Sequence, residues 1–185
     1  MTPASELGRQ VHALLASQPV PEPDFEALHL ADTFERSDLG HRARKAKRIE
    51  HEFDVMFAIG DMVVRGQIDL WFEERGGRVI VDYKTDDVAP DEAEARASAY
   101  KLQLRYYALA IEKLTGALPA EAWIYFLRPD IAVRVGLRTP DLEEARGLVA
   151  DLAAAQRTRK FPLNEGAHCL RCPFYRGKCP AGTGS

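Results

Sequence analysis

Hydrophobic residues near the start of the chain recur at helical intervals and predict a helix over residues 2–15; they are Leu7, Val11, Leu14 and Leu15. A run of prolines beginning at Pro19 ends this helix, because proline lacks the backbone donor that a helix interior needs. A second helix is expected over the strongly basic residues 42–50.

An alternation of apolar and polar residues follows and predicts a strand that carries Phe53, Val55 and Phe57. Two more strands are expected over residues 62–72 and 78–84, divided by a glycine-containing turn. The strands are joined by short connections, so the pattern predicts an antiparallel meander.

The second half of the chain predicts a long helix, two strands and a final helix, over residues 93–114, 122–128, 132–137 and 140–156. Gly116 follows the long helix, as glycine commonly does at helix ends. Helices that alternate with groups of strands indicate an α/β fold, in which one mixed β-sheet is flanked by helices. The tail after Phe161 carries all three cysteines and is expected to be irregular.

The chain of 185 residues is 46% hydrophobic and 29% charged, the composition of a globular protein. We expect one domain over residues 1–185, with residues 161–185 as its cysteine-bearing tail. No apolar run approaches the ~20 residues of a membrane helix, and no basic-then-apolar leader opens the chain. We therefore expect a cytoplasmic protein without a membrane partner.

Charged residues number 25 basic and 28 acidic, a net charge of −3, so the chain as a whole has no positive field to attract nucleic acid. Contact with DNA must then be local. The best candidates for phosphate contacts are the clustered basic residues Arg42, Arg44, Lys45, Lys47 and Arg48.

Residues 66–86 predict a hairpin with acidic residues at its centre. If the turn is symmetric about Arg75 and Gly76, Asp69 faces Asp82 on the neighbouring strand. Directly opposed side chains have Cβ atoms about 4.5–5.5 Å apart, and like charges there are destabilising. A divalent cation would compensate, and carboxylate oxygens suit Mg²⁺ or Mn²⁺.

Lys84 emerges on the same strand face as Asp82, whereas Tyr83 points to the other face. Such a group can cleave a phosphodiester, because the cation polarises the phosphoryl oxygen and the lysine stabilises developing charge or orients the attacker. The alternative is that these are solvated residues near a turn. The apolar run over residues 79–81 favours a buried strand instead, although a one-residue register slip would turn Asp69 away.

These motifs resemble the RecB-like branch of the PD-(D/E)XK nuclease superfamily over residues 5 to about 180. The resemblance is carried by Leu7-Gly8-x-x-Val11-His12, Asp69, the run Asp82-Tyr83-Lys84-Thr85, and the helical pair Gln103 and Tyr107. It implies a restriction-endonuclease-like fold, with metal ligands His12, Asp69, Asp82 and the Tyr83 carbonyl. It also implies that Lys84 is the catalytic lysine, with Gln103 and Tyr107 beside the site.

The residues alone leave some of these roles open. Neutral imidazole is a common metal ligand, but a lone histidine such as His12 is more often structural. Gln103 and Tyr107 share one helical face, where they could orient the lysine, touch the DNA backbone or simply pack. Glu50 matches an acidic position that the family places ahead of the sheet, and it either supports the site or is solvated.

The tail cysteines Cys169, Cys172 and Cys179 resemble the C-terminal end of the iron–sulfur members of this family, which bind a [4Fe–4S] cluster with a fourth, upstream cysteine. This sequence has no upstream cysteine, and both clusters and zinc ordinarily take four ligands. Three explanations stay open. The chain is an excised domain whose missing flank holds the fourth cysteine, His168 completes a zinc site, or the motif is vestigial.

The resulting hypothesis is a Mg²⁺- or Mn²⁺-dependent deoxyribonuclease. The family implies an exonuclease that acts on single-stranded DNA ends in recombination or double-strand break repair, with a helicase in cis or in trans. The chain would be part of an AddA- or UvrD-like helicase–nuclease, or a free-standing exonuclease similar to those of CRISPR adaptation. The alternative is a catalytically inactive nuclease-like module that binds DNA or a helicase.

Overall fold

The computed structural model describes residues 3–175 and 177–179, so Thr2 and the end of the tail lie outside the described residues. One sheet has the strand order β1-β2-β3-β4-β5. Its strands are β1 (Arg48–Ile59), β2 (Met62–Glu74), β3 (Gly77–Lys84), β4 (Glu121–Phe126) and β5 (Ile131–Arg134). β3 and β4 are parallel and the other neighbours are antiparallel, so the predicted mixed sheet and the meander are confirmed.

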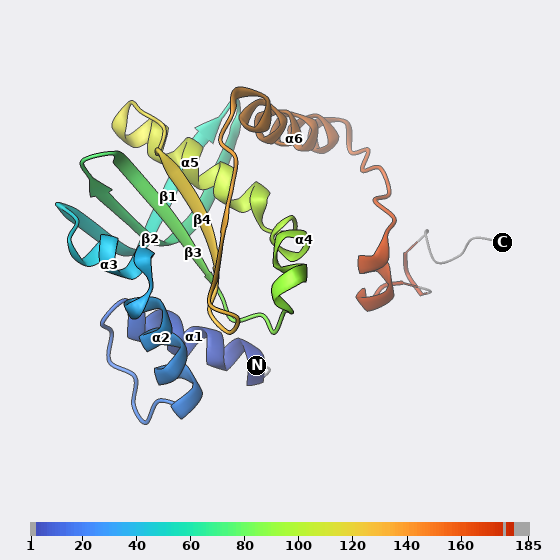
Figure 1. The fold of residues 1–185 in the computed structure, drawn as a ribbon. Coiled ribbons are helices and arrows are strands. Elements are labelled where there is room, and N and C mark those ends of the chain that lie inside the picture. Colours follow the sequence, from blue (N-terminus) through green and yellow to red (C-terminus); the bar gives the residue numbers. More distant parts are fainter. Residues whose placement is uncertain (1–2, 176, 180–185) are drawn as a thin grey trace.

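Helices cover both faces of this sheet (Figure 1). One face carries α1 (Pro3–Leu15), α2 (Phe25–Arg36) and α3 (Asp38–Arg44). The other carries α4 (Ala93–Ala97), α5 (Lys101–Thr115) and α6 (Thr139–Thr158), and two short 3₁₀ turns are η1 (Pro90–Glu92) and η2 (Ala167–Arg171). The α/β fold class predicted from the alternation of elements is confirmed.

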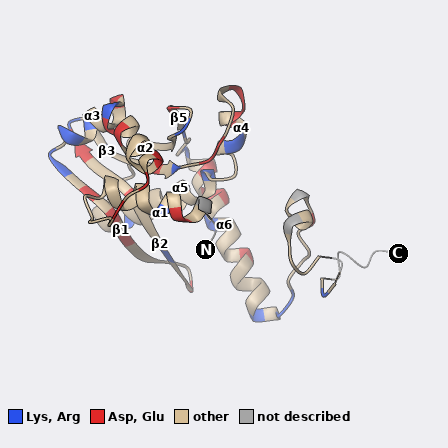
Figure 2. Ribbon diagram, turned by 90° about the horizontal axis from the view of Figure 1, so that it is seen from below, with Lys and Arg blue, Asp and Glu red and all other residues tan. Residues whose placement is uncertain are grey.

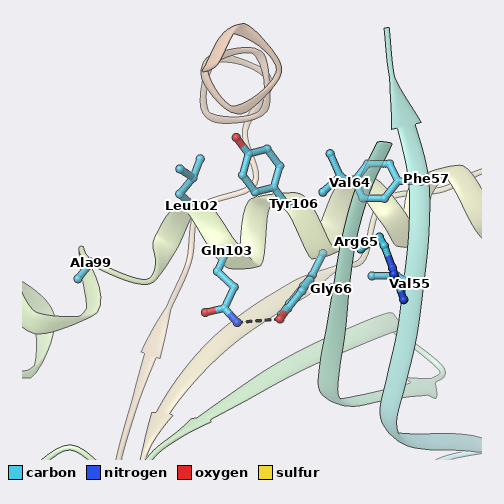
Figure 3. A pocket seen from close by; sticks show the side chains of 10 residues that line it. Val55, Phe57, Val64, Arg65, Gly66, Ala99, Leu102, Gln103 and Tyr106 are labelled. Atoms are coloured by element: carbon cyan, nitrogen blue, oxygen red, sulfur yellow. Dashed lines mark hydrogen bonds between the residues drawn. The ribbon is translucent and has the colours of Figure 1, made fainter. Parts of the chain in front are cut away.

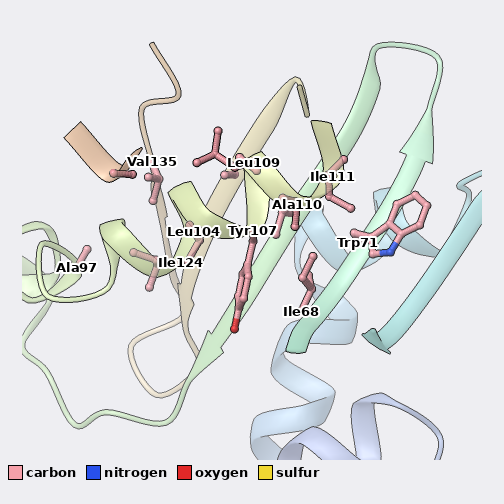
Figure 4. Close-up of a cluster of buried hydrophobic side chains, with 14 of the residues drawn as sticks. Ile68, Trp71, Ala97, Leu104, Tyr107, Leu109, Ala110, Ile111, Ile124 and Val135 are labelled. Carbon is pink, nitrogen blue, oxygen red and sulfur yellow. The ribbon is translucent and has the colours of Figure 1, made fainter. Parts of the chain in front are cut away.

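The hydrophobic core has one layer on each side of the sheet. Under α5, Leu104 packs with Ile80 and Ile124 (Figure 4). Under α1 and α2, Phe34 packs with Val81 of β3 and its neighbours. The residues of β3 from Val79 to Tyr83 are all at most 2% exposed. The prediction that this strand is buried on both faces is therefore confirmed.

The helix predicted over residues 42–50 is wrong. α3 ends at Arg44 and β1 already begins at Arg48. Pairing with β2 overrides the helical pattern here, because Ile49 pairs with Phe72 and the Arg48 guanidinium lies over the Trp71 ring. α2 and the start of α3 were not predicted by the apolar pattern.

The helix predicted over residues 93–114 is two helices, α4 and α5, separated by a turn over residues 98–100. At this turn the Tyr100 hydroxyl is held by Asp86, from the loop that follows β3. The end at Gly116 is confirmed, and its φ of +78° is a conformation that favours glycine. No helix in the described part of the chain is long and apolar enough to span a membrane.

Gly66 lets α5 approach the sheet closely. A Cβ atom at this position would lie 2.9 Å from Cε1 of Tyr107. We predict that Gly66→Ala lowers the free energy of unfolding by about 1–3 kcal/mol, because overpacking forces the ring or the strand to move. Gly147→Ala in α6 is the control, since its Cβ would meet open space and alanine favours a helix. Urea denaturation of both variants checks this; equal stabilities would contradict it.

Candidate metal and catalytic site

Three side chains from different elements meet beside α1: His12 of α1, Glu52 of β1 and Asp69 of β2. Nδ1 of His12 lies 3.2 Å from Oε1 of Glu52 and 3.5 Å from Oδ1 of Asp69. One ligand atom from each residue lies within 4.8 Å of the others, and the described residues contain no second group of this kind.

An irregularity in the sheet brings this group together. The β1–β2 ladder keeps one register but lacks the pair of Glu52 with Asp69, and Glu52 has φ +48°, which is uncommon outside glycine. Ile68 and Trp71 both pack under α5, although residues three apart in a regular strand face opposite sides. The break in alternation therefore turns Glu52 and Asp69 toward His12.

The second carboxylate comes from β3. The predicted β2–β3 register is confirmed where the strands pair, and Asp69 and Asp82 stand one step beyond the pair of Leu70 with Val81. Oδ2 of Asp69 accepts a hydrogen bond from the backbone N–H of Tyr83 at 2.8 Å. Asp69 is 7% exposed and Asp82 is 0% exposed. Two carboxylates are thus enclosed within the sheet.

Lys84 forms an ion pair with Asp82, as expected for residues on the same strand face. Its contact does not satisfy the carboxylate, because neither oxygen of Asp82 has a hydrogen-bond partner of good geometry among the described residues. A buried carboxylate without such hydrogen bonds is costly in its charged form. The structure therefore leaves Asp82 with coordinating capacity that no described protein group uses.

The protonation equilibria of the site reflect this burial. Burial raises the pKa of Asp69 from 3.8 to about 7, and the charge of Asp82 adds to the rise. Burial also raises the pKa of Asp82, against the opposing effect of Lys84. Burial lowers the pKa of His12, but the hydrogen bond to Glu52 and the charge of Asp69 outweigh it, so the net shift is upward.

The donor set fits a divalent cation. Carboxylate oxygens and an imidazole nitrogen are ligands that Mg²⁺ or Mn²⁺ accept, and the unpartnered oxygens of Asp82 supply the vacant lone pairs. A bound cation would also relieve the repulsion that raises the pKa of Asp69.

Tyr83 and Lys84 lie on opposite faces of β3, as the alternation predicts. The Tyr83 ring packs at 4.7 Å from the Phe34 ring, between centroids, and at 5.7 Å from the imidazole of His12. Its side chain thus belongs to the core under α1 and α2, and only its main chain can serve the site.

Gln103 and Tyr107 share one face of α5, as predicted, and their side chains are joined: Nε2 of Gln103 donates to the Tyr107 hydroxyl at 2.7 Å (dashed line in Figure 3). Burial raises the pKa of Tyr107 to about 12, and the charges of Asp82 and Asp69 contribute to the rise. The pair therefore lies within electrostatic reach of the two carboxylates.

A pocket of about 440 Å³ opens between α5 and the β1–β2 hairpin. Tyr107 and Gln103 form one of its walls, and apolar side chains such as Val55, Phe57 and Leu102 line the rest (Figure 3). Because Tyr107 faces both the pocket and the carboxylates, the pocket is a neighbour of the site.

Sequence reasoning chose Glu50 where the structure places Glu52. Glu50 forms an ion pair with Arg48 at 2.7 Å and takes no part in the group around His12. A signal for Glu52 exists in the sequence: a hairpin centred on Gly60 and Asp61 brings Glu52 opposite Asp69, and the observed register is the one that such a hairpin gives.

The basic residues after α3 lie away from the carboxylates. Arg42 pairs with Glu74 at 2.7 Å and with Glu121 at 2.9 Å, and the segment borders the β2–β3 turn near α3 (Figure 2). Lys84 is at the opposite end of β3, an eight-residue strand, which at ~3.3 Å per residue separates them by roughly 20 Å. The structure therefore does not bring this segment to the candidate site.

The tail cysteines are free and half-buried. Sγ of Cys169 lies 3.7 Å from Nε2 of the adjacent His168. Cys169, Cys172 and Cys179 line one pocket together with His168, but these groups do not converge within the 4.8 Å that the His12 group satisfies. Pro180, which follows Cys179, lies outside the described residues. The cluster, the zinc site and the vestigial motif stay predictions.

Comparison with known proteins agrees with this geometry. Residues 23–180 match the family model of the PD-(D/E)XK nuclease superfamily, so the chain belongs to that superfamily. Its relatives include an ATP-dependent helicase/nuclease protein of Alkaliphilus oremlandii, 29% identical over 70% of this chain. The protein of the same name from Carboxydothermus hydrogenoformans is 34% identical over 71% of this chain. The chain is therefore a RecB-like PD-(D/E)XK nuclease domain in sequence and fold.

The chain spans only 12% and 13% of the length of these two relatives. Among solved structures, a putative exonuclease from Eubacterium rectale superposes with a TM-score of 0.59 at 13% identity, covering 94% of this chain and 73% of that chain. That likeness shows the fold alone.

The raised pKa values predict how the stability of the metal-free chain depends on pH. Between pH 3.8 and about 7 the folded chain keeps the Asp69 proton that the unfolded chain has lost, so stability falls with rising pH by about 1.4 kcal/mol per pH unit for each such proton. His12 acts in the same direction, because a raised pKa gives stability that is present below 6.5 and lost at higher pH.

Urea denaturation in EDTA at pH 5 and pH 8 tests this expectation. The wild type is expected to be less stable at pH 8, and Asp69→Asn should reduce the difference, whereas Asp151→Asn, at an exposed position of α6, should not. Mn²⁺ should restore stability more at pH 8 than at pH 5, since it binds the deprotonated carboxylates. Higher stability of the metal-free wild type at pH 8 would contradict the assignment.

Proposed function

We propose that this domain is a metal-dependent deoxyribonuclease that hydrolyses DNA phosphodiester bonds. The observation that carries the proposal is Asp82, a fully buried carboxylate without a hydrogen-bond partner among the described residues, next to the carboxylate of Asp69 and the ammonium of Lys84. Such a group is stable in its charged form only with a compensating cation.

Four groups would hold the cation: the side chains of His12, Asp69 and Asp82 and the carbonyl of Tyr83. Glu52 adds a further carboxylate within 3.2 Å of His12, either as a ligand or as the acceptor that orients the imidazole. A bound Mg²⁺ or Mn²⁺ would polarise a phosphoryl oxygen and lower the pKa of a water molecule.

The remaining residues act on the phosphate directly. Lys84, whose side chain is 17% exposed, offers a fixed positive charge to the negative charge that develops on the phosphate. The Tyr107 hydroxyl accepts a hydrogen bond from Gln103, so its own proton can be donated to a phosphate oxygen. The raised pKa of Tyr107 keeps that proton in place.

We further propose that the substrate is a single-stranded DNA end delivered by a helicase, and that the domain acts as an exonuclease in recombination or break repair. The names of its relatives join helicase and nuclease in one protein, of which this chain matches a small part. The pocket beside Tyr107 supports an unpaired substrate, because its apolar walls can accept a base that has left the duplex stack.

Cleavage assays test the reaction itself. We expect the purified chain to cleave labelled DNA with Mg²⁺ or Mn²⁺, and both Asp82→Asn and Lys84→Ala to lower the rate by about 100-fold or more, since each removes transition-state stabilisation. Asp151→Asn should cleave like the wild type. Circular dichroism must show that the variants are folded. DNA binding without cleavage at any metal concentration would favour the inactive binding module.

Strand preference is tested with one oligonucleotide presented alone or annealed to its complement. Faster cleavage of the single strand is expected. An abasic site introduced next to the scissile bond should raise KM if the pocket accepts a base, and replacing Ala99 at the pocket rim by Trp should abolish that abasic effect. Equal rates on both forms, or an abasic effect that survives in Ala99→Trp, would contradict this part of the proposal.

A further inference from the structure

The ammonium of Lys84 has two neighbours. On one side it pairs with the Asp82 carboxylate, and on the other its Nζ lies 4.7 Å from the centroid of the Tyr100 ring. A cation above an aromatic face is attracted by the ring quadrupole, more strongly where water is excluded. The Lys84 side chain is largely enclosed, so the ring replaces part of its hydration.

Tyr100 is itself fixed by its hydroxyl group. The hydroxyl donates to Oδ1 of Asp86 at 2.9 Å and accepts from the Arg96 guanidinium at 2.8 Å. Arg96 also donates to Asp86 at 2.6 Å, which closes a three-membered network. The ring therefore has little freedom to rotate away from Lys84.

The three members of this network come from three segments. Asp86 follows β3 by two residues, Arg96 belongs to α4, and Tyr100 precedes α5 at the break between the two helices. A continuous helix over this region would place Tyr100 differently. The same short stretch of chain that carries Lys84 also carries the anchor of the ring, so the lysine and the ring are held relative to each other.

We propose that Tyr100 is a positioning residue for Lys84. Its ring, oriented by Asp86 and Arg96, keeps the ammonium beside Asp82, where the substrate phosphate is expected. This inference rests on the proposed function of Lys84 in phosphodiester cleavage.

Kinetics separate positioning from packing, since Tyr100 also approaches Phe126 at 6.4 Å between ring centroids. Tyr100→Leu should lower kcat about 10-fold with little change in KM, and Tyr100→Phe, which keeps the ring, should lose less. In the Lys84→Ala background Tyr100→Leu should have no further effect in single-turnover assays. Trp123→Leu, which removes a ring 5.8 Å from the Arg134 guanidinium elsewhere in the sheet, should leave kcat unchanged.

A spectroscopic measurement reads the contact without any cleavage. Lysines are reductively methylated with ¹³C, and the Lys84 signal is identified by its loss in Lys84→Arg. We expect an upfield ring-current shift in the wild type, its retention in Tyr100→Phe and its loss in Tyr100→Leu.

The outcomes distinguish the two proposals. An inactive wild type with the ring-current shift intact would refute the proposed reaction but support the Lys84–Tyr100 contact. An unshifted Lys84 signal, or a loss of rate from Tyr100→Leu that is equally large with and without Lys84, would overturn the positioning role.

Discussion

The structure depends on the enclosure of two carboxylates in an otherwise apolar layer. Strand β3 is buried on both faces, so Asp82 enters the interior simply by belonging to it. Asp69 joins it because one of its oxygens accepts the backbone N–H of Tyr83. Charge in such a place must be compensated or neutralised. Lys84 and His12 compensate it in part, and the raised pKa of Asp69 shows how incomplete this compensation is without a cation.

The sequence predicts the centre of this arrangement and misses its periphery. The register of the β2–β3 hairpin follows from a short turn, which is a local signal, and it correctly brings Asp69 to Asp82. Glu52 escapes a simple alternation rule, because the strand departs from regular alternation at that residue. The supposed helix over residues 42–50 is wrong for a related reason: pairing with β2 is a tertiary effect that local periodicity does not contain.

The break between α4 and α5 is a second feature that periodicity conceals. The apolar spacing is compatible with one long helix, but the chain turns at Tyr100, where side chains from three segments meet. What distinguishes a nuclease site from an ordinary mixed sheet is therefore a few departures from regular structure. Each of them aims a polar side chain at the end of β3, and family membership supports a hydrolytic reading of that convergence.

Anomalous diffraction from a crystal soaked in Mn²⁺ tests the central claim most directly. The account predicts a manganese peak bounded by the side chains of His12, Asp69 and Asp82, with the ammonium of Lys84 nearby, and no such peak in Asp82→Asn. A wild-type crystal without density at that position, or with the three side chains directed apart, would contradict it.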